Sequence, residues 1–429
     1  SAMKLHIETL KGWVSPTNAF IALYSDAPNS FWLDREFSAA ARFSIIGTGS
    51  EVDFKGIESF AENLENYDDA ELPFAFRPGL VGWLDFEMQN PRFLRVESAM
   101  VFDHENRHLY LIAKTDSDEK FRRWLDAALL RIGLIGGESL KYLAGVDEPE
   151  VRSIVPRHNE EEYLELIHKA QKHIANGDVY QLCLTNEYEI DAKADPLATF
   201  IALREISPAP YSGYFKFGET VLVSSSPEQF IQAGVDGIVS SKPIKGTRPR
   251  GETEAKDLAI IEELSLNQKE RAENLMIVDL MRNDLSRVCE VDSVTVEKLF
   301  DVETYATVHQ LVSTVKGKLA SGKRAGDVIA AAFPGGSMTG APKIRAIEII
   351  RDLEAGPRGI YSGVAGYLGD NGSADFGMVI RSLVFAAGKI TLGVGGGITI
   401  DSEPLAELAE TKLKAKALLR ALKAPNLLG

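Results

Sequence analysis

The chain has 429 residues, of which 45% are hydrophobic and 25% are charged, as in a globular protein with two or three domains or one large α/β or α+β body. Its formal net charge of −15 argues against a nucleic-acid partner held by overall charge, so an anionic ligand would have to meet a local basic patch. Cys183 and Cys289 show no metal-ligand spacing and no apolar run approaches the roughly 18 residues of a membrane span, so we expect a cytoplasmic protein with no membrane partner.

The N-terminal part is predicted to be rich in strands. Ser1 and Ala2 precede Met3 and look like the remnant of a cleaved tag. Residues 3–150 are expected to form a sheet-forming subdomain, because short apolar runs such as "FSIIGTG", "GLVGWLDFEM" and "HLYLIAK" alternate with Gly, Pro and Asn breaks. "SDEKFRRWLDAALLRIGLI" has helical spacing. Residues 141–157 lack a steady period and contain prolines, which predicts a connection there.

Helices and strands are expected to mix in the second region, residues 151–429. It opens on a helix in "NEEEYLELIHKAQKHIANG", with Asn159 as its cap and Gly177 as its stop. Strands are expected in "VYQLCLTNEYEI", "YSGYFKFG", "TVLVSSSPEQF" and "TYATVHQLVSTVKGKL", a long helical region ends at Asp284, and a last helix covers "PLAELAETKLKAKALLRAL". The predicted class is α+β, with strand-rich sheets and helices packed outside.

Four basic side chains lie close together in "SKPIKGTRPRG", residues 241–251, although the chain as a whole is acidic. Lys245 stands among them, between Ile244 and Gly246. Burial and neighbouring cations favour the neutral form of a lysine amine, and the neutral amine is a nucleophile. An ordinary solvated loop lysine would have the same neighbours in sequence. This stretch alone leaves both interpretations open.

Two pairs of carboxylates have helical spacing. Glu270 and Glu273 are three residues apart in one predicted helix, and Glu407 and Glu410 repeat that spacing in the last helix, one turn before Lys414. Four such carboxylates could bind one hard divalent cation, which prefers oxygen ligands. Each pair taken singly is also typical of a solvated helix face. Spacing does not show whether the two helices meet.

The glycine-rich stretches match no nucleotide-binding motif. "GGSMTGAPK" lacks the Lys-Ser or Lys-Thr of a phosphate-binding loop, and "GVGGGIT" does not open a helix. The glycines of the second stretch could still bring backbone N–H groups close to an anion. His309 is expected by default to be a structural histidine. Arg381, inside the apolar "MVIRSL", requires a buried anion, which could be an internal carboxylate or a ligand.

Ten stretches taken together carry a family resemblance. They are "GDVYQLCLTN", "SSSPEQF", "PIKGTRPRG", "ENLMIVDLMRND", "TYATVHQLVSTVKG", "PGGSMTGAPK", "YSGVAGYL", "MVIRSL", "GVGGGIT" and "AETKLKAKAL". Through them residues 157 to 420 resemble the chorismate-utilising enzymes, while the N-terminal part matches loosely through "GLVGWLDFEM" and "FWLD". The resemblance implies one α+β body like that of anthranilate synthase component I, in which two stacked mixed or antiparallel sheets lie between outer helices and the two regions interweave.

The resemblance also implies a Mg²⁺ ion that binds the ring carboxylate of chorismate. Glu273 and Glu410 match the metal ligands, and Glu270 and Glu407 match carboxylates that act through water. Glu228 matches the general acid that helps the C4 hydroxyl leave. The positions that match substrate-binding residues are Gln181, Thr247, His309, Ser337, Tyr361, Arg381, Gly395, Gly396, Gly397 and Lys414.

Two positions indicate a branch of the family. Gln181 stands where isochorismate- and salicylate-forming members carry a water-activating lysine, and glutamine cannot act as that base. Lys245 stands where anthranilate-forming members typically have alanine, and it resembles the lysine of the aminodeoxychorismate branch. There the lysine amine attacks C2, the C4 hydroxyl leaves and ammonia then enters at C4. Lys242 stands where we would expect arginine, which leaves its salt-bridge partner open. The other basic residues of the stretch suit an anionic diacid.

The resemblance implies partners and leaves alternatives. No stretch resembles a glutaminase, so a separate glutaminase subunit would supply ammonia for p-aminobenzoate and folate synthesis. Some members bind tryptophan in the N-terminal sheet, although the Leu-Leu-Glu-Ser pattern of feedback-regulated anthranilate synthases is not found here. The alternatives are anthranilate synthase component I, an enzyme that makes both aromatic amines, and a non-catalytic sensor that binds tryptophan or a glutaminase.

Overall fold

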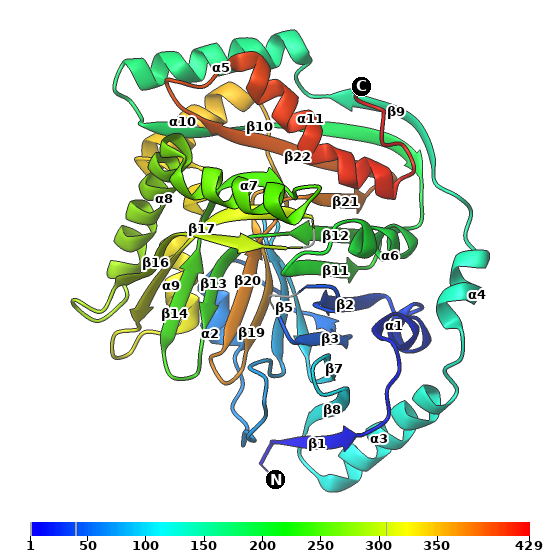
Figure 1. Cartoon of the computed structure of the whole chain (residues 1–429). Helices are drawn as coiled ribbons and strands as arrows, with labels where there is room; N and C mark the ends of the chain where they lie inside the picture. Colours follow the sequence, from blue (N-terminus) through cyan, green and yellow to red (C-terminus); the bar gives the residue numbers. More distant parts are fainter. Residues whose placement is uncertain (1, 39–40, 306) are drawn as a thin grey trace.

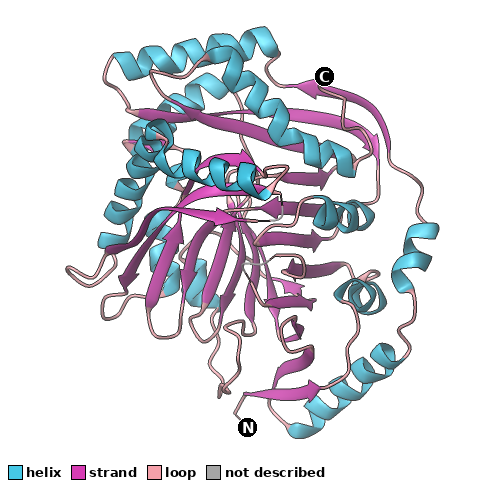
Figure 2. Ribbon diagram, in the orientation of Figure 1, coloured by secondary structure: helices cyan, strands magenta, loops and turns pink. Residues whose placement is uncertain are grey.

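Two antiparallel sheets stacked face to face form the body of the protein (Figure 1). The computed structural model describes residues 2–38, 41–305 and 307–429. Helices lie on the outer faces of the sheets, as Figure 2 shows in cyan against the magenta strands. The predicted α+β fold with two stacked sheets is confirmed, and the strand pairs are antiparallel.

The larger sheet has 12 strands in the described part of the chain. Its order is β1 (Lys4–Leu10), β8 (His108–Thr115), β7 (Ser98–Asp103), β3 (Phe43–Gly47), β2 (Asn29–Asp34), β11 (Tyr211–Phe217), β12 (Thr220–Ser226), β21 (Ser382–Ala386), β22 (Lys389–Ile398), β10 (Gln181–Lys193) and β18 (Gly340–Ala341), with β9 (Glu150–Pro156) also paired to β10. Phe31 of β2 lies opposite Phe215 of β11. The N-terminal strands therefore continue directly into the sheet of the C-terminal region.

The smaller sheet has 10 strands within the described ranges. Its order is β15 (Ile244–Pro249), β17 (Val308–Lys318), β14 (Ile238–Lys242), β13 (Gln229–Ala233), β20 (Ala374–Met378), β19 (Val364–Gly369), β5 (Gly79–Leu84), β6 (Arg92–Val96) and β4 (Ser50–Glu51), with β16 (Thr295–Thr304) also paired to β17. Gly82 of β5 lies opposite Gly366 of β19, so this sheet too joins both regions of the chain.

The helices cover the two outer faces. Those that contact the larger sheet or pack beside it are α1 (Pro16–Tyr24), α3 (Asp118–Gly133), α5 (Glu160–Ala175), α6 (Pro196–Ile206), α10 (Lys343–Glu354) and α11 (Pro404–Ala421). Those on the smaller sheet are α2 (Ser59–Asn63), α7 (Glu254–Leu266), α8 (Gln268–Ser286) and α9 (Ala325–Ala332), and α4 (Glu138–Ala144) packs on α1. None of these helices in the described residues is long and apolar enough to cross a membrane.

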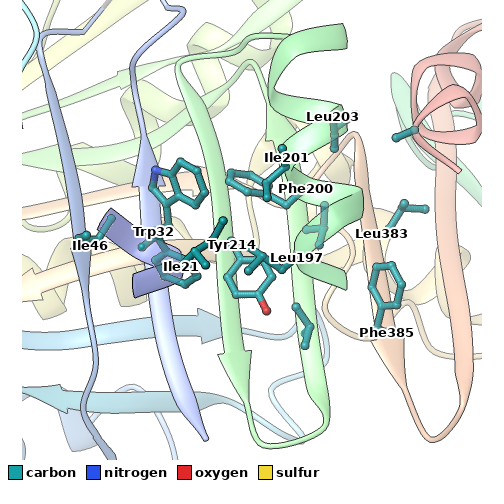
Figure 3. Close-up of a cluster of buried hydrophobic side chains, with 14 of the residues drawn as sticks. Ile21, Trp32, Ile46, Leu197, Phe200, Ile201, Leu203, Tyr214, Leu383 and Phe385 are labelled. Atoms are coloured by element: carbon teal, nitrogen blue, oxygen red, sulfur yellow. The ribbon is translucent and has the colours of Figure 1, made fainter. Parts of the chain in front are cut away.

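Side chains alternate between the two faces of each strand and therefore pack into separate hydrophobic cores. On β2, Trp32 faces outward into the core beneath α1 and α6, where it packs on Phe200 and Tyr214 (Figure 3). Its neighbours Phe31 and Leu33 face inward and join the core between the two sheets. Complete burial of one such side chain contributes roughly 1.5–3 kcal/mol, so these cores hold the two sheets and the outer helices together.

Three local predictions can be compared with the structure. Asn159 caps α5 in a capping box with Glu162, as its sequence suggested. The long helical region before Asp284 is two helices, because Asn267 ends α7 and caps α8. The connection expected at residues 141–157 is wrong in part, since it contains the end of α4 and all of β9. Hydrogen bonding to β10, rather than an apolar pattern, makes β9 a strand.

Candidate active site

A polar pocket collects most of the predicted site residues. Strands β15, β17 and β22 and helices α8 and α11 line it, together with the 3₁₀ turn Gly336–Met338. The predicted residues among its lining are Glu228, Lys245, Thr247, Glu270, Glu273, Ser337, Tyr361, Arg381, Gly395, Gly396, Gly397, Glu407, Glu410 and Lys414. Gln181 and His309 are not part of that lining. A concave site with converging charged groups suits a small polar ligand.

Lys245 reaches the pocket from an irregular part of β15. The register of β15 against β17 shifts here, and Gly246 has a φ of 105°, a conformation that favours glycine. A Cβ at Gly246 would lie 3.2 Å from the Cβ of Glu270, so glycine also lets the strand approach α8. The Lys245 Nζ donates one long hydrogen bond of 3.5 Å to the Ser337 carbonyl oxygen. Among the described residues it forms no ion pair, which leaves the amine facing the pocket.

Glu228 is a buried carboxyl at the same end of the pocket. Its Oε2 accepts a 2.5 Å hydrogen bond from the Ser337 hydroxyl, and its Oε1 accepts a 3.3 Å bond from the Ile244 N–H. Burial raises the pKa of Glu228, and the bond from Ser337 and the positive charge of Lys245 oppose that shift. A carboxyl whose protonated form is favoured in this way can donate a proton to a leaving group.

The four predicted carboxylates meet across the pocket. Glu270 and Glu273 come from α8, Glu407 and Glu410 come from α11, and all four line the same cavity. Burial raises the pKa of Glu273, and the negative charges of Glu270 and Glu410 add to the shift. Burial, followed by the charge of Glu410, raises the pKa of Glu407 to about 7. The two helices that spacing alone could not connect therefore line the same pocket.

The carboxylates suit a hard cation that also takes ligands from elsewhere. In the described residues no three His, Cys, Asp or Glu side chains lie close enough to hold a metal by themselves. Mg²⁺ usually binds through one or two carboxylates plus water and substrate oxygens. Burial is the main cause of the raised pKa values of Glu273 and Glu407, and the neighbouring carboxylates add a repulsion that a bound cation would relieve.

Arg381 and Tyr361 form an anion-binding side of the pocket. Arg381 has a φ of 51°, and its guanidinium forms no ion pair with any described residue. Burial lowers its pKa, while the negative charge of Glu410 opposes that shift. The Tyr361 ring packs on Gly393, where a Cβ would lie 2.2 Å from ring atoms. A guanidinium and a phenol without partners can bind a ligand carboxylate.

Lys414 and the three glycines complete this side. The Lys414 Nζ donates to the Gly395 carbonyl oxygen at 2.9 Å and lies 3.5 Å from the Glu410 Oε1. Burial lowers the pKa of Lys414. A Cβ at Gly396 would lie 3.2 Å from the Glu407 Oε2. A larger residue at Gly396 would therefore crowd the Glu407 carboxylate and take up space in the pocket.

Gln181 lies next to the pocket although it is not part of the lining. The residue is fully buried, and its amide nitrogen and oxygen both lack a hydrogen-bond partner among the described residues. A Cβ at Gly397 would lie 3.3 Å from the Lys245 Nζ and 3.7 Å from the Gln181 Nε2. A side chain at Gly397 would therefore contact both the Gln181 amide and the Lys245 amine.

His309, which the resemblance places in the substrate pocket, lies outside it. Its Nε2 is 2.6 Å from the Asp257 Oδ1, and its Nδ1 is 2.8 Å from the Thr304 hydroxyl. Alternation along β17 turns His309 toward α7 and turns the next residue, Gln310, into the pocket. The default interpretation of His309 as a satisfied structural histidine agrees with these contacts.

The basic stretch does not face the pocket as a group. Lys242 pairs with Glu303 at 2.6 Å, which supplies the salt-bridge partner that the sequence left open. The two arginines are also paired with carboxylates of the protein: Arg248 with Glu263 at 3.0 Å and Glu270 at 3.3 Å, and Arg250 with Asp257 at 2.8 Å. The expectation that all of these cations face an anionic ligand is therefore wrong.

Among the polar residues of the lining, Lys269 and Gln310 drew no attention in the sequence. Lys269 and Gln310 both face the pocket. Lys269 precedes Glu270 on α8, and its positive charge opposes the raised pKa of Glu407. Neighbouring residues of a strand face opposite sides. Because His309 was expected to be structural, this alternation could have identified the next residue, Gln310, as a lining residue. Nothing in the local pattern distinguishes Lys269 from a solvated helix lysine.

Known proteins with similar sequences and folds extend this result. The family model for chorismate binding enzymes matches residues 28–420. Aminodeoxychorismate synthase of Streptomyces pristinaespiralis is 38% identical over 98% of this chain and 65% of its own length. The enzyme of that name from Streptomyces griseus is 40% identical over 94% of this chain and 62% of its own length. The chain thus spans less than two thirds of each of these relatives.

A solved structure agrees with the family match. Anthranilate synthase component I from Streptococcus pneumoniae superposes with a TM-score of 0.79 at 28% identity, covering 94% of this chain and 97% of its own. The resemblance predicted from the ten stretches is confirmed by the family model and by the relatives. This chain belongs to the family of chorismate-binding enzymes.

Proposed function

We propose that the chain is an aminodeoxychorismate synthase component I, which converts chorismate and ammonia to 4-amino-4-deoxychorismate and water. One observation carries the proposal: the Lys245 amine faces the pocket without an ion pair, beside the buried carboxyl of Glu228. The names of the two Streptomyces relatives support it. An unpaired amine in a closed site is available as a nucleophile.

The charges of the pocket orient the dianionic substrate. Arg381 and Tyr361 would bind the carboxylate of the enolpyruvyl group, with Lys414 nearby. The ring carboxylate would then face the carboxylates of α8 and α11. There Glu273 and Glu410 would hold Mg²⁺, with Glu270 and Glu407 acting through water. The ion would supply the positive charge that lets an anionic ring approach these glutamates.

The two residues at the other end perform the chemistry. The neutral Lys245 amine attacks C2 of the ring, the double bond shifts, and the C4–O bond breaks. Glu228 gives its proton to the departing hydroxyl, which leaves as water, and a covalent lysine adduct remains. Ammonia then forms a bond at C4, the double bond shifts back, and the C2–N bond to Lys245 breaks. The enolpyruvyl group is retained, and proton transfer returns the lysine and Glu228 to their starting forms.

Ammonia would come from a glutaminase. Both cysteines are buried, and Cys183 is part of the lining of the pocket itself. We propose, as the family resemblance implies, that a glutaminase delivers ammonia to the pocket. The product would enter the synthesis of p-aminobenzoate and folate.

Mass spectrometry of the products tests this function. The purified chain is incubated with chorismate, MgCl₂ and ammonium chloride, with no lyase present. We expect aminodeoxychorismate with its enolpyruvyl group, and loss of that product by at least about a thousandfold in Lys245→Ala. Lys242→Ala, which loses a lysine paired outside the pocket, should stay within about twofold of the wild type.

The similarity to anthranilate synthase component I supports a second candidate. That enzyme would release anthranilate and pyruvate in the same assay. A wild-type rate of aminodeoxychorismate formation by Lys245→Ala would refute covalent catalysis. Anthranilate as the main product of the wild type would assign the chain to the second candidate.

A further inference from the structure

Gln310 presents a buried amide oxygen that no group of the protein satisfies. The residue is only 3% exposed. It stands on β17 directly opposite Thr247 of β15 and lines the pocket. Its Oε1 has no hydrogen-bond partner among the described residues. A buried carbonyl oxygen left unpaired costs free energy, so such groups are few in native proteins and need an explanation.

Another glutamine of the same sheet shows that the fold can satisfy a buried amide. The Gln229 Oε1 accepts a 3.0 Å hydrogen bond from the Tyr211 hydroxyl, and its Nε2 donates to the Ser240 hydroxyl at 3.0 Å. Gln229 lies outside the pocket that contains the catalytic lysine. The unpaired amide of Gln310 is therefore a feature of the pocket rather than of the sheet.

No neighbour of Gln310 among the described residues donates a hydrogen bond to this oxygen, although Lys245, Thr247 and Lys269 line the same pocket. Oε1 can only accept, so it requires an O–H or N–H group. Glu270 and Glu273 on the same cavity are acceptors when ionised. The Arg248 guanidinium is already bonded to Glu263 and Glu270. The Gln310 Oε1 is therefore open to a donor on a molecule that enters the pocket.

We propose that Gln310 contacts a reactant directly, with its Oε1 accepting a hydrogen bond from an O–H or N–H group of that reactant. This inference rests on the proposed function. Chorismate carries carboxylates and an ether oxygen, which only accept, and one class of donor, its C4 hydroxyl. The second reactant, ammonia, is a donor through its N–H bonds. Gln310 is thus assigned to the positioning of the group that leaves C4 or of the group that arrives there.

An uncharged side chain suits this role. Five glutamates already line the pocket, and a further anion would oppose a dianionic substrate. A carboxamide accepts a hydrogen bond with no net charge, and it does not titrate. The contribution of Gln310 should therefore be the same across the pH range in which the enzyme is active.

The test compares Gln310→Met with Gln232→Met. Methionine keeps the length of the side chain and removes the acceptor. Gln232 is an exposed glutamine on β13 of the same sheet and serves as the matched control. Gln310→Leu is measured in parallel, so that the result does not depend on the folding of one variant. Each protein is assayed with chorismate, MgCl₂ and ammonium chloride, and its melting temperature is recorded.

The rate of adduct formation and the KM for ammonium distinguish the two possible donors, and the melting temperature reports on folding. Formation of the covalent adduct on Lys245 is monitored by intact-mass spectrometry in the absence of ammonium. If the partner of the Gln310 Oε1 is the C4 hydroxyl, this adduct forms about 3- to 10-fold more slowly in both Gln310 variants. If the partner is ammonia, the adduct forms at the wild-type rate and the KM for ammonium rises by a similar factor. In both cases the melting temperature stays equal or rises, because an unsatisfied buried group has been removed.

Other results overturn the inference. Unchanged adduct formation and unchanged KM values in folded Gln310 variants would mean that only water meets Oε1. A fall in melting temperature without a kinetic change would assign Gln310 a structural role. These outcomes differ from failure of the proposed function, in which the wild type itself makes no aminodeoxychorismate.

Discussion

The buried ion pair behind the pocket wall is fully bonded within the fold, whereas several polar groups that face the pocket lack a partner among the described residues. Behind the wall, Arg358 and Glu354 form an ion pair at 2.8 Å with each side chain about 2% exposed. Arg358 also donates to the carbonyl oxygens of Met338 and Cys183, at 2.5 and 2.9 Å. Glu354 accepts two further bonds from Thr185. Each donor and acceptor in this cluster has a partner within the fold.

Several groups on the other side of that wall lack partners or are disfavoured in their charged form. Arg381 lacks an ion pair in the described part of the chain, and the amides of Gln181 and Gln310 contain unpaired buried atoms. Glu228 and Glu407 have raised pKa values because burial disfavours their charge. The Arg358–Glu354 cluster is thus satisfied within the fold, whereas Arg381 and the amide oxygen of Gln310 are open to a ligand. This difference separates structural from functional charge without reference to any relative.

Glu228→Gln, which changes a group that faces the pocket, should have the largest effect on turnover among the following substitutions. We expect turnover to fall by about 10²- to 10⁴-fold, because glutamine cannot donate the proton that the C4 hydroxyl needs. The wild-type rate should also decline as pH rises through the raised pKa of Glu228, since only the protonated carboxyl is active. Steady-state assays from pH 5 to pH 9 measure both effects. Glu219→Gln, on an exposed turn, is the control. Turnover near the wild-type level in Glu228→Gln would exclude Glu228 as the acid.

Replacing one arginine on each side of the wall tests the comparison directly. Arg358→Met leaves Glu354 buried and unpaired, so the free energy of unfolding should fall by about 3–5 kcal/mol. Arg381→Met removes a cation without a partner, so stability should change by less than about 1 kcal/mol while the KM for chorismate rises at least about tenfold. Urea unfolding and steady-state kinetics measure the two quantities. Equal losses of stability would show that Arg381 also has a structural partner.

The sequence predicted most of the fold because local signals agreed with the tertiary structure. The capping box at Asn159 and the spacing of the last helix led to α5 and α11. β9 was missed because its alternating polar residues carry little apolar pattern, and it is a strand through its bonds to β10. The break at Asn267 was missed because helical spacing continues on both sides of it.

The site was predictable where spacing or family motifs mark it. The spacing of the four glutamates placed each pair on one helix face, but only the folded chain shows that α8 and α11 meet. The motif led to Lys245, yet the pairing of Lys242, Arg248 and Arg250 with carboxylates required the tertiary contacts. An unpaired atom such as the Gln310 Oε1 cannot be seen in a sequence, because it depends on what fails to approach it.

Glu407→Gln should produce the smallest effect, and it depends on pH. The folded-state pKa of Glu407 is raised to about 7 from a usual value near 4.3. Its protonated form is therefore favoured by folding, and the stability that it contributes is complete below about pH 4 and is lost as pH rises through about 7. Glutamine does not ionise and avoids this loss. In metal-free protein the variant should melt at the wild-type temperature near pH 4 and about 1–3 °C higher at pH 8.

Adding Mg²⁺ to the same melting experiment tests whether the carboxylates of α8 and α11 bind the ion. If Mg²⁺ binds among them, MgCl₂ at pH 8 stabilises the wild type by neutralising the same repulsion that glutamine removes. The ion should then raise the melting temperature of the wild type more than that of Glu407→Gln. Glu348→Gln, on the exposed face of α10, should follow the wild type. An equal shift in all three proteins would place the metal away from Glu407, and the raised pKa would then reflect burial alone.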